Sequence, residues 1–189
     1  MQVGILALQG AIEPHLRKLK RLGVDTLEVR RERDLAGLCG IILPGGESST
    51  MLRLLATNDL LDPLTRFIAH TPTWGLCAGA ILLAKTVENP AQPSIGAIDV
   101  TITRNAYGRQ LESFIDTIRP TAQWADTQVR EGVFIRAPRI GTLGPLCETL
   151  FYWHNDPVVV KSSHILLTTF HPELSEPDTF HEFFLGMCR

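Results

Sequence analysis

The chain has 189 residues, of which 44% are hydrophobic and 20% are charged, and its formal net charge is -2. This balance is typical of a water-soluble globular domain, and it gives no sign of a nucleic-acid-binding surface or an acidic tail. No apolar run approaches the roughly 20 residues that a membrane span needs, and the N-terminus lacks the basic start of a signal peptide. We therefore expect one domain over residues 1–189, located in the cytoplasm.

The cysteines and histidines are spaced in a way that disfavours metal binding. The four cysteines form no C-x-x-C pair, and the six histidines form no H-x-x-x-H pair. Widely scattered cysteines also argue against a disulfide framework and fit a reducing compartment. We therefore expect no metal ion.

The first half of the chain alternates short apolar runs with amphipathic segments. Strands are expected at residues 2–8, 25–30, 40–43 and 71–76. Helices are expected at residues 12–22, after the glycine turn at 44–46, and at residues 78–87. Such alternation predicts a mostly parallel sheet with helices on both faces, as in three-layer, flavodoxin-like α/β folds.

The second half of the chain is richer in strands. Apolar runs predict strands at residues 97–104, 132–137, 157–163 and 164–170, with little helix between them. We expect these strands to be antiparallel additions to the sheet. Phe180, Phe183, Phe184 and Met187 recur at helical spacing and predict a closing helix, which Ser175 and Pro177 would start.

The segment W-G-L-C-A-G-A sets Cys77 between Gly75 and Gly79, where a predicted strand meets a predicted helix. The spacing is that of a nucleophile elbow, G-x-S-x-G, with cysteine in place of serine. A turn this sharp brings neighbouring backbones too close for a Cβ, so sterics explain why both positions are glycine. It would expose the sulfur at a helix N-terminus, where the dipole favours the reactive thiolate. The alternative is a cysteine that only fills space in the core.

A thiol nucleophile needs a base, and the segment F-H-P-E-L places His171 and Glu173 directly after an apolar strand. Residues two apart in an extended chain point the same way, so Glu173 could orient the imidazole toward Cys77. Pro172 favours this geometry because it keeps the preceding residue out of the helical region. The alternative is a strand-end histidine beside a solvated glutamate. The remaining histidines lack such a carboxylate and are interpreted as surface or packing residues: His15, His70, His154, His164 and His181.

A third motif is L-P-G-G-E-S at residues 43–48. Successive glycines ahead of a helix expose backbone N–H groups that can bind an oxyanion or a carboxylate, although P-G-G alone is only a turn. The N–H of Gly46 and the N–H of Ala78, next to Cys77, could together form an oxyanion hole. The three motifs therefore converge on one site at the carboxyl edge of the sheet.

In this order, the elbow at Cys77 and the late His171-x-Glu173 pair resemble the class I, triad-type glutamine amidotransferases. More narrowly, the chain resembles the glutaminase subunits of pyridoxal 5'-phosphate synthase, on motifs spread over nearly its whole length. These motifs are LALQGA, ILPGGESSTM, RNAYGRQLESF, GVFIRAP and FHPEL. The resemblance implies that six residues contact glutamine: Gly46, Glu47, Ser48, Arg104, Ile135 and Arg136.

The resemblance implies hydrolysis of L-glutamine to L-glutamate and ammonia through a γ-glutamyl thioester on Cys77, with no cofactor. The ammonia would pass to a larger synthase subunit that builds pyridoxal phosphate from sugar phosphates. No nucleic acid and no membrane is implied as a partner. Two alternatives stay open: a glutaminase of histidine or nucleotide biosynthesis, and a non-catalytic α/β binding or stress protein. RNAYGRQLESF and FIRAP disfavour the first, and the H-x-E pair disfavours the second.

The resemblance also implies a hetero-oligomer in which the synthase partner switches the glutaminase on. The glycine turn at residues 44–46 can reverse a peptide at little steric cost, aiming either an N–H or a carbonyl at the oxyanion. We expect Gln9 and Gly10 to lie at the same edge of the sheet, near enough for a docked partner to bias this turn. The basic face of the following helix is either a docking surface or a solvated face. It comprises Arg17, Lys18, Lys20 and Arg21.

Overall fold

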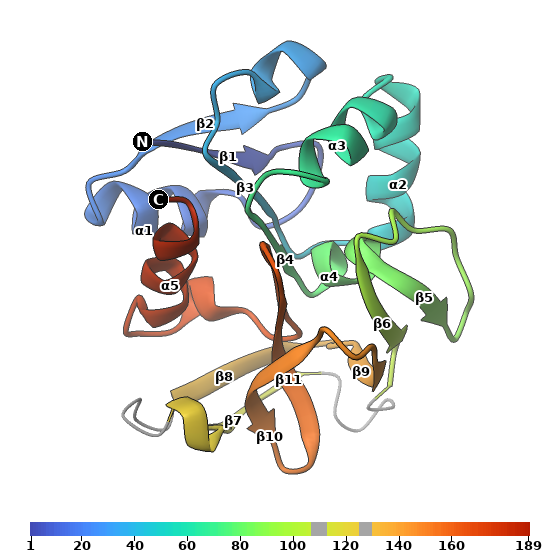
Figure 1. Cartoon of the computed structure of the whole chain (residues 1–189), viewed down its shortest axis with the longest axis vertical. Helices are drawn as coiled ribbons and strands as arrows, with labels where there is room; N and C mark the ends of the chain where they lie inside the picture. The colour runs from blue at the N-terminus through green and yellow to red at the C-terminus, as the bar shows by residue number, and fades with distance from the viewer. Residues whose placement is uncertain (107–112, 125–129) are drawn as a thin grey trace.

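The structure, a computed structural model, describes residues 1–106, 113–124 and 130–189 (Figure 1). Within these ranges the strands form one large sheet and one small sheet. In pairing order, the large sheet contains β2 (Asp25–Val29), β1 (Gln2–Leu6), β3 (Gly40–Leu43), β4 (Thr73–Leu76), β12 (Ile165–Thr168), β11 (Asp156–Ser162), β10 (Glu148–Trp153), β7 (Ser113–Pro120) and β8 (Arg130–Ile135). The small sheet contains β5 (Ala84–Glu88), β6 (Ile98–Thr103) and β9 (Arg139–Leu143). The helices are α1 (Glu13–Arg21), α2 (Ser48–Thr57), α3 (Leu61–Ile68), α4 (Ala78–Leu83) and α5 (Thr179–Met187), with short 3-10 turns η1 (Glu32–Leu35), η3 (Ala122–Trp124) and η4 (Pro172–Leu174).

The large sheet changes character along its width. From β2 to β12 every neighbouring pair of strands is parallel. From β12 to β8 every pair is antiparallel. The prediction of an α/β sheet with antiparallel additions from the second half of the chain is therefore confirmed. The parallel half matters for function, because the carboxyl ends of its strands meet along one edge.

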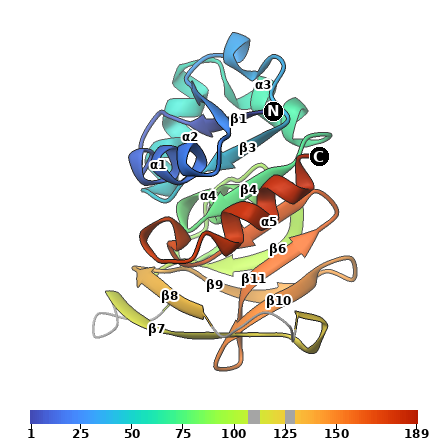
Figure 2. The same cartoon turned by 90° about the vertical axis from the view of Figure 1, so that its left-hand side faces the viewer.

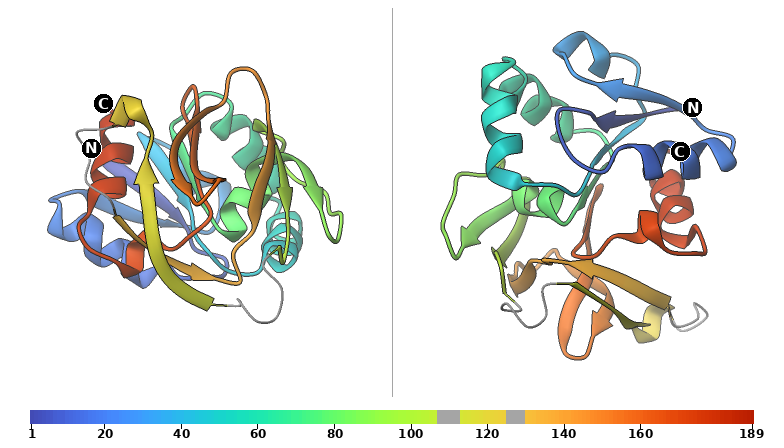
Figure 3. Two further views of the ribbon diagram at one scale, coloured as in Figure 1. Left: turned by 90° about the horizontal axis from the view of Figure 1, so that it is seen from below. Right: turned by 180° about the vertical axis from the view of Figure 1, so that it is seen from behind.

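Helices cover the two faces of the parallel half, and the apolar side chains of β3 show why. Ile42 belongs to a buried cluster with residues of α1 and α5, whereas Ile41 and Leu43 belong to a second cluster with residues of α2, α3 and α4. Strand side chains alternate between faces, so a strand that is apolar throughout needs cover on both sides. Figures 2 and 3 show α1 and α5 together on one face and α2 and α3 on the other.

Two predictions about individual elements are wrong. The helix expected at residues 78–87 ends at Leu83, and β5 follows at once. The β-branched residues Thr86 and Val87 favour a strand there, and β5 pairs in parallel with β6. The strand expected at residues 97–104 is β6, but it lies in the small sheet and not in the large one.

The closing helix is confirmed over Phe180 to Met187, but its start is wrong: α5 begins at Thr179, after Ser175 and Pro177. The segment before α5 is instead bound to α1. Lys18 donates to the Ser175 carbonyl at 2.7 Å and pairs with Asp178 at 2.6 Å, and Arg21 pairs with Asp178 and Glu176. Lys18 is only 5% exposed, so its assignment to the outer face of α1 is wrong. These ion pairs fix α1 against α5 behind the site.

Candidate active site

Cys77 occupies a strained turn between β4 and α4. Its φ of 48° and ψ of -101° are rare for a residue with a side chain, and such strain is often found at reactive groups. Its glycine neighbours make the turn possible. A Cβ on Gly79 would collide with the Leu43 carbonyl oxygen, and one on Gly75 would lie 2.7 Å from the Gly79 carbonyl oxygen. The predicted elbow and the steric reason for its glycines are therefore confirmed. The expected exposure is not, because Cys77 is only 7% exposed.

His171 and Glu173 form a buried pair beside the elbow. Their Nδ1 and Oε1 atoms are 2.7 Å apart, and the residues are 6% and 4% exposed. The backbone N–H of His171 donates to the Val133 carbonyl at 2.8 Å, which attaches the base to β8. Glu173 lies in the 3-10 turn η4 and not in an extended segment. The prediction of an extended segment is therefore wrong, although the structure does bring the two side chains together.

The electrostatics of the pair favour a charged imidazole. Burial lowers the pKa of His171, but hydrogen bonds to Cys77 and Glu173 and their negative charges outweigh it and raise the pKa to about 10. Burial raises the pKa of Glu173, yet the hydrogen bond from His171 leaves it below its usual value. At neutral pH the raised pKa of His171 and the lowered pKa of Glu173 therefore favour an imidazolium beside a carboxylate. Its proton is available to a leaving group.

These groups open onto a pocket of about 420 Å³. Cys77 and His171 line it, and so do all six residues that the resemblance assigns to glutamine: Gly46, Glu47, Ser48, Arg104, Ile135 and Arg136. The motifs that place them are far apart in the sequence, since residues 46–48 follow β3 of the large sheet and Arg104 follows β6 of the small sheet, but the fold brings them to one cavity. Part of the motif RNAYGRQLESF, residues 107–112, lies outside the described residues.

The polar lining combines a fixed carboxylate with a cation. Glu47 caps α2 by accepting from the backbone N–H groups of Ser49 and Thr50. Burial raises the pKa of Glu47, but hydrogen bonds from Thr50 and Ser49 outweigh this and lower the pKa to about 2. Arg104 pairs with the same carboxylate at 3.2 Å and is 16% exposed at its side chain. The pocket thus presents a cation and an anion side by side, the complement of an α-amino acid.

The glycine turn is held by the segment that follows β1. The Gly45 carbonyl accepts from the Ala11 N–H at 3.1 Å, and the Glu47 N–H donates to Gln9 Oε1 at 3.0 Å. The expectation that Gln9 and Gly10 lie beside this turn is confirmed. Ala78 is the first residue of α4, where helix N–H groups have no intrahelical acceptor. Its N–H is therefore suited to bind an anion.

Two further polar residues of this region, Gln92 and Asn105, were not singled out from the sequence. Gln92 Oε1 accepts from the Ser48 hydroxyl at 3.1 Å, and Asn105 lines the pocket. Gln92 lies between β5 and β6, so a strand pair in place of the expected helix is what brings it to Ser48. The thiol of Cys77 lies 3.9 Å from the Ile135 carbonyl oxygen.

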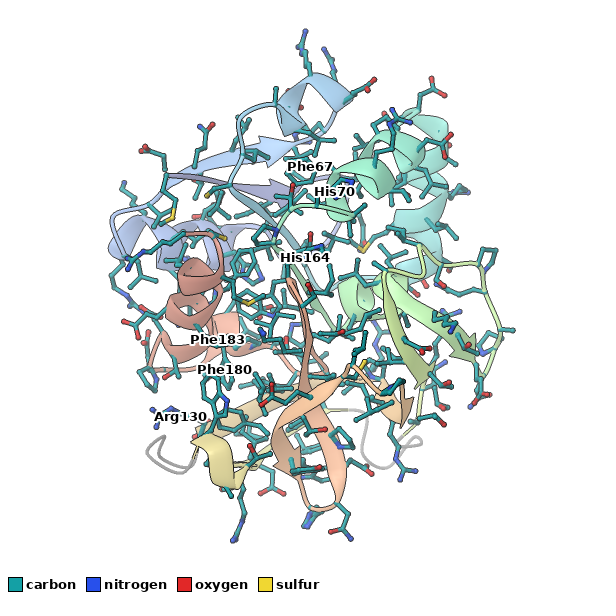
Figure 4. The ribbon with its side chains drawn as sticks, viewed as in Figure 1. Phe67, His70, Arg130, His164, Phe180 and Phe183 are labelled. Atoms are coloured by element: carbon teal, nitrogen blue, oxygen red, sulfur yellow. The ribbon has the colours of Figure 1, made fainter. Side chains whose placement is uncertain are left out.

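The remaining histidines fall into three groups. His154 is exposed, as predicted, but its Nε2 lies 3.9 Å from Asp116 Oδ2, so the prediction that it has no carboxylate partner is wrong. His70 and His164 precede β4 and β12, at the opposite ends of these strands from Cys77, and His164 Nε2 contacts the Ile68 carbonyl at 2.8 Å (Figure 4). His15 and His181, by contrast, are fully buried behind the pair of His171 and Glu173. His15 Nε2 is 3.9 Å from Glu173 Oε2, so the prediction that it has no carboxylate partner is wrong.

Over residues 1–106, 113–124 and 130–189, no group of three His, Cys, Asp or Glu side chains could hold a metal ion. In the same part of the chain, no helix is long and apolar enough to cross a membrane.

Comparison with known proteins gives consistent matches along the chain. The model of the SNO glutamine amidotransferase family matches residues 5–189. The pyridoxal 5'-phosphate synthase subunit PdxT of Koribacter versatilis (strain Ellin345) is 46% identical over 189 residues, which cover 100% of this chain and 96% of that protein. The PdxT subunit of Deinococcus radiodurans is 45% identical over 194 residues, covering 100% and 97%. A crystal structure of a glutamine amidotransferase superposes with a TM-score of 0.91 at 39% identity, covering 98% of both chains.

Proposed function

This chain belongs to the SNO glutamine amidotransferase family, and from that premise we propose that it hydrolyses L-glutamine as the glutaminase subunit of a cytoplasmic pyridoxal 5'-phosphate synthase. One observation carries the proposal: a strained elbow cysteine shares a pocket with a buried His–Glu pair. The names of the full-length relatives support a role in pyridoxal 5'-phosphate synthesis over one in histidine or nucleotide biosynthesis.

The first half-reaction forms a thioester. The Cys77 thiolate attacks the side-chain amide carbon of glutamine, and the carbonyl oxygen becomes an oxyanion that the N–H groups of Gly46 and Ala78 stabilise. His171 then gives its proton to the amide nitrogen, and ammonia leaves as the C–N bond breaks. This leaves a γ-glutamyl thioester on Cys77 and a neutral imidazole.

The second half-reaction releases glutamate. Neutral His171 takes a proton from a water molecule as that water attacks the thioester carbonyl, and the C–S bond breaks. The thiolate and the imidazolium are thereby restored, and no other reactant is consumed. Glu173 holds His171 in one tautomer throughout, because its carboxylate accepts from Nδ1 and leaves Nε2 to face the sulfur.

Arg104 is the residue of the pocket suited to the α-carboxylate of glutamine, and Glu47 is suited to its α-ammonium. An α-carboxylate is paired equally in the ground state and the transition state, so this contact sets affinity more than rate. We expect Arg104→Met to raise KM by about 10- to 100-fold with kcat changed little, the loss expected for a charge-assisted hydrogen bond. Arg66→Met is the control, because Arg66 forms an exposed pair with Glu32. A variant with unchanged KM and lowered kcat would contradict this role.

We further propose that the larger synthase subunit switches the glutaminase on through the turn at Gly45 and Gly46. The contact from Ala11 to the Gly45 carbonyl supports this route, because a partner that moves residues 9–11 would release the peptide that this contact restrains. The pairing of Lys18 and Arg21 with residues just before α5 makes the basic face of α1 less suited to dock a partner than its sequence suggests.

Glutamate and ammonia release, measured with and without the synthase subunit, tests both proposals. We expect the rate of glutamate release to rise by about 10²- to 10³-fold when the partner is added, because one oxyanion-hole donor changes kcat by about this factor. Equal rates with and without the synthase subunit would contradict the proposed switch but not the glutaminase assignment. No glutamate release in either case, from protein that is folded, would overturn the glutaminase assignment itself.

A further inference from the structure

Two histidines from different helices form a buried pair behind the active site. His15 belongs to α1 and His181 to α5, which lie on the same face of the large sheet (Figure 2). Neither residue is exposed, and His15 Nδ1 lies 3.0 Å from His181 Nε2. Trp74 of β4 meets both rings edge-on, at ring-centroid distances of 6.0 and 4.9 Å. Packing therefore fixes both imidazoles.

His15 also faces the triad. The Oε1 atom of Glu173 is bound to His171, but its Oε2 atom is buried and has no hydrogen-bond partner within the described residues. His15 Nε2, which likewise has none there, lies 3.9 Å from this oxygen. That separation is too long for a hydrogen bond but short enough for a strong interaction between a dipole and a charge in a buried site.

The shared proton of the two histidines has two possible positions. If His15 Nδ1 donates to His181, neutral His15 directs the lone pair of Nε2 at a carboxylate oxygen, which is repulsive. If His181 Nε2 donates to His15, the proton of His15 is on Nε2 and faces Glu173. Because Glu173 is ionised, the second arrangement has the lower energy. The geometry thus aligns His181, His15, Glu173 and His171 in one hydrogen-bonded and electrostatic series that ends at Cys77.

His15 stays neutral through the range in which the enzyme would work. Burial lowers its pKa to about 3, and although the charge of Glu173 acts in the opposite direction, His181, His171 and Lys18 add to the lowering. Its dipole toward Glu173 is therefore constant at neutral pH.

The partner ring is neutral as well. Burial lowers the pKa of His181 to about 3, and Lys18 and Arg21 act in the same direction while Asp178 opposes them. Within the described residues, the charged and titratable side chains that act on the two histidines are therefore Glu173, His171, Lys18, Arg21 and Asp178.

We propose that His15 is a positioning residue for glutamine hydrolysis, whose Nε2–H holds Glu173 in the orientation and the ionised state that His171 requires. The inference rests on the proposed glutaminase activity. During turnover His171 alternates between imidazolium and imidazole, and Glu173 must stay charged and directed at Nδ1 in both states. A carboxylate without a contact at its second oxygen is less restrained and more easily protonated.

Two near-isosteric variants separate this role from simple packing. The amide of glutamine reaches the place of His15 Nε2, whereas the shorter amide of asparagine reaches only the place of Nδ1. We expect His15→Asn to lower kcat on the order of 10-fold, the smaller effect typical of losing a partner behind a functional group, with KM little changed. We expect His15→Gln to retain most of the activity. In His15→Asn the acid limb of the kcat/KM profile should move to higher pH, because Glu173 loses a group that favours its charge.

The measurements are glutamate release with the synthase subunit present, its pH profile, and thermal unfolding of each variant. His164→Gln is the matched control, since His164 is bonded to a backbone carbonyl far from the triad. The rate at which a small alkylating reagent modifies Cys77 gives a second readout that needs no partner, and His15→Asn should lower it at neutral pH. Equal activity and equal acid limbs in the Asn and Gln variants would overturn the proposal, as would losses that follow thermal stability alone. A wild-type protein that releases no glutamate would instead overturn the function.

Discussion

Replacing Cys77 by alanine should abolish glutamine hydrolysis, lowering kcat on the order of 10³- to 10⁶-fold, as removal of a triad member does. The reason is local: Cys77 is the cysteine at the elbow and in the pocket, and without its sulfur no thioester can form. Glutamate release in the presence of the synthase subunit measures the effect. Cys147→Ala is the control, because its thiol contacts the Asp99 carbonyl away from the pocket. A Cys77→Ala protein with wild-type glutaminase activity would contradict the assignment.

Replacing His171 by asparagine should be nearly as severe, on the order of 10³-fold or more in kcat. The variant loses both the proton that ammonia needs and the base that activates water. The wild-type rate should fall as the pH rises through about 10, where the raised pKa of His171 lets the imidazolium lose its proton. The residual activity of the variant should lack this alkaline limb.

Glu173→Ala should keep more activity than His171→Asn, because Glu173 orients the base without itself exchanging a proton with substrate. The pH profiles of kcat for the three proteins, recorded in parallel, make the comparison. Two results would contradict these roles. One is a wild-type alkaline limb in which kcat already falls at a pH well below 9, and the other is a His171→Asn variant that is more active than Glu173→Ala.

The sequence predicted the elbow because its chemistry is local. Five consecutive residues, from Gly75 to Gly79, contain the nucleophile and both glycines that its turn requires. The His171 and Glu173 pair was also found from spacing, although a 3-10 turn and not an extended strand brings the side chains together. Short motifs with a single steric or chemical demand are therefore readable without a structure.

What the sequence did not predict depends on contacts between distant segments. His15 and Lys18 looked like ordinary helix residues, and only the packing of α1 against the segment before α5 gives them partners. Likewise, residues 84–88 have apolar spacing that suits either a helix or a strand, and pairing with β6 decides for the strand. Local propensity is weak where tertiary pairing supplies the larger energy.

The most direct test of the central claim, a covalent glutaminase with Cys77 as its nucleophile, uses a glutamine analogue that carries a chloromethyl ketone in place of the side-chain amide. A thiolate displaces the chloride and forms a stable thioether, so the reagent marks the residue that attacks glutamine. Intact-mass measurement and peptide mapping should show one equivalent on Cys77, loss of glutamate release in parallel with labelling, and protection by glutamine. Glutamine hydrolysis that persists after Cys77 is fully modified, or inactivation that follows labelling of another residue, would contradict the account.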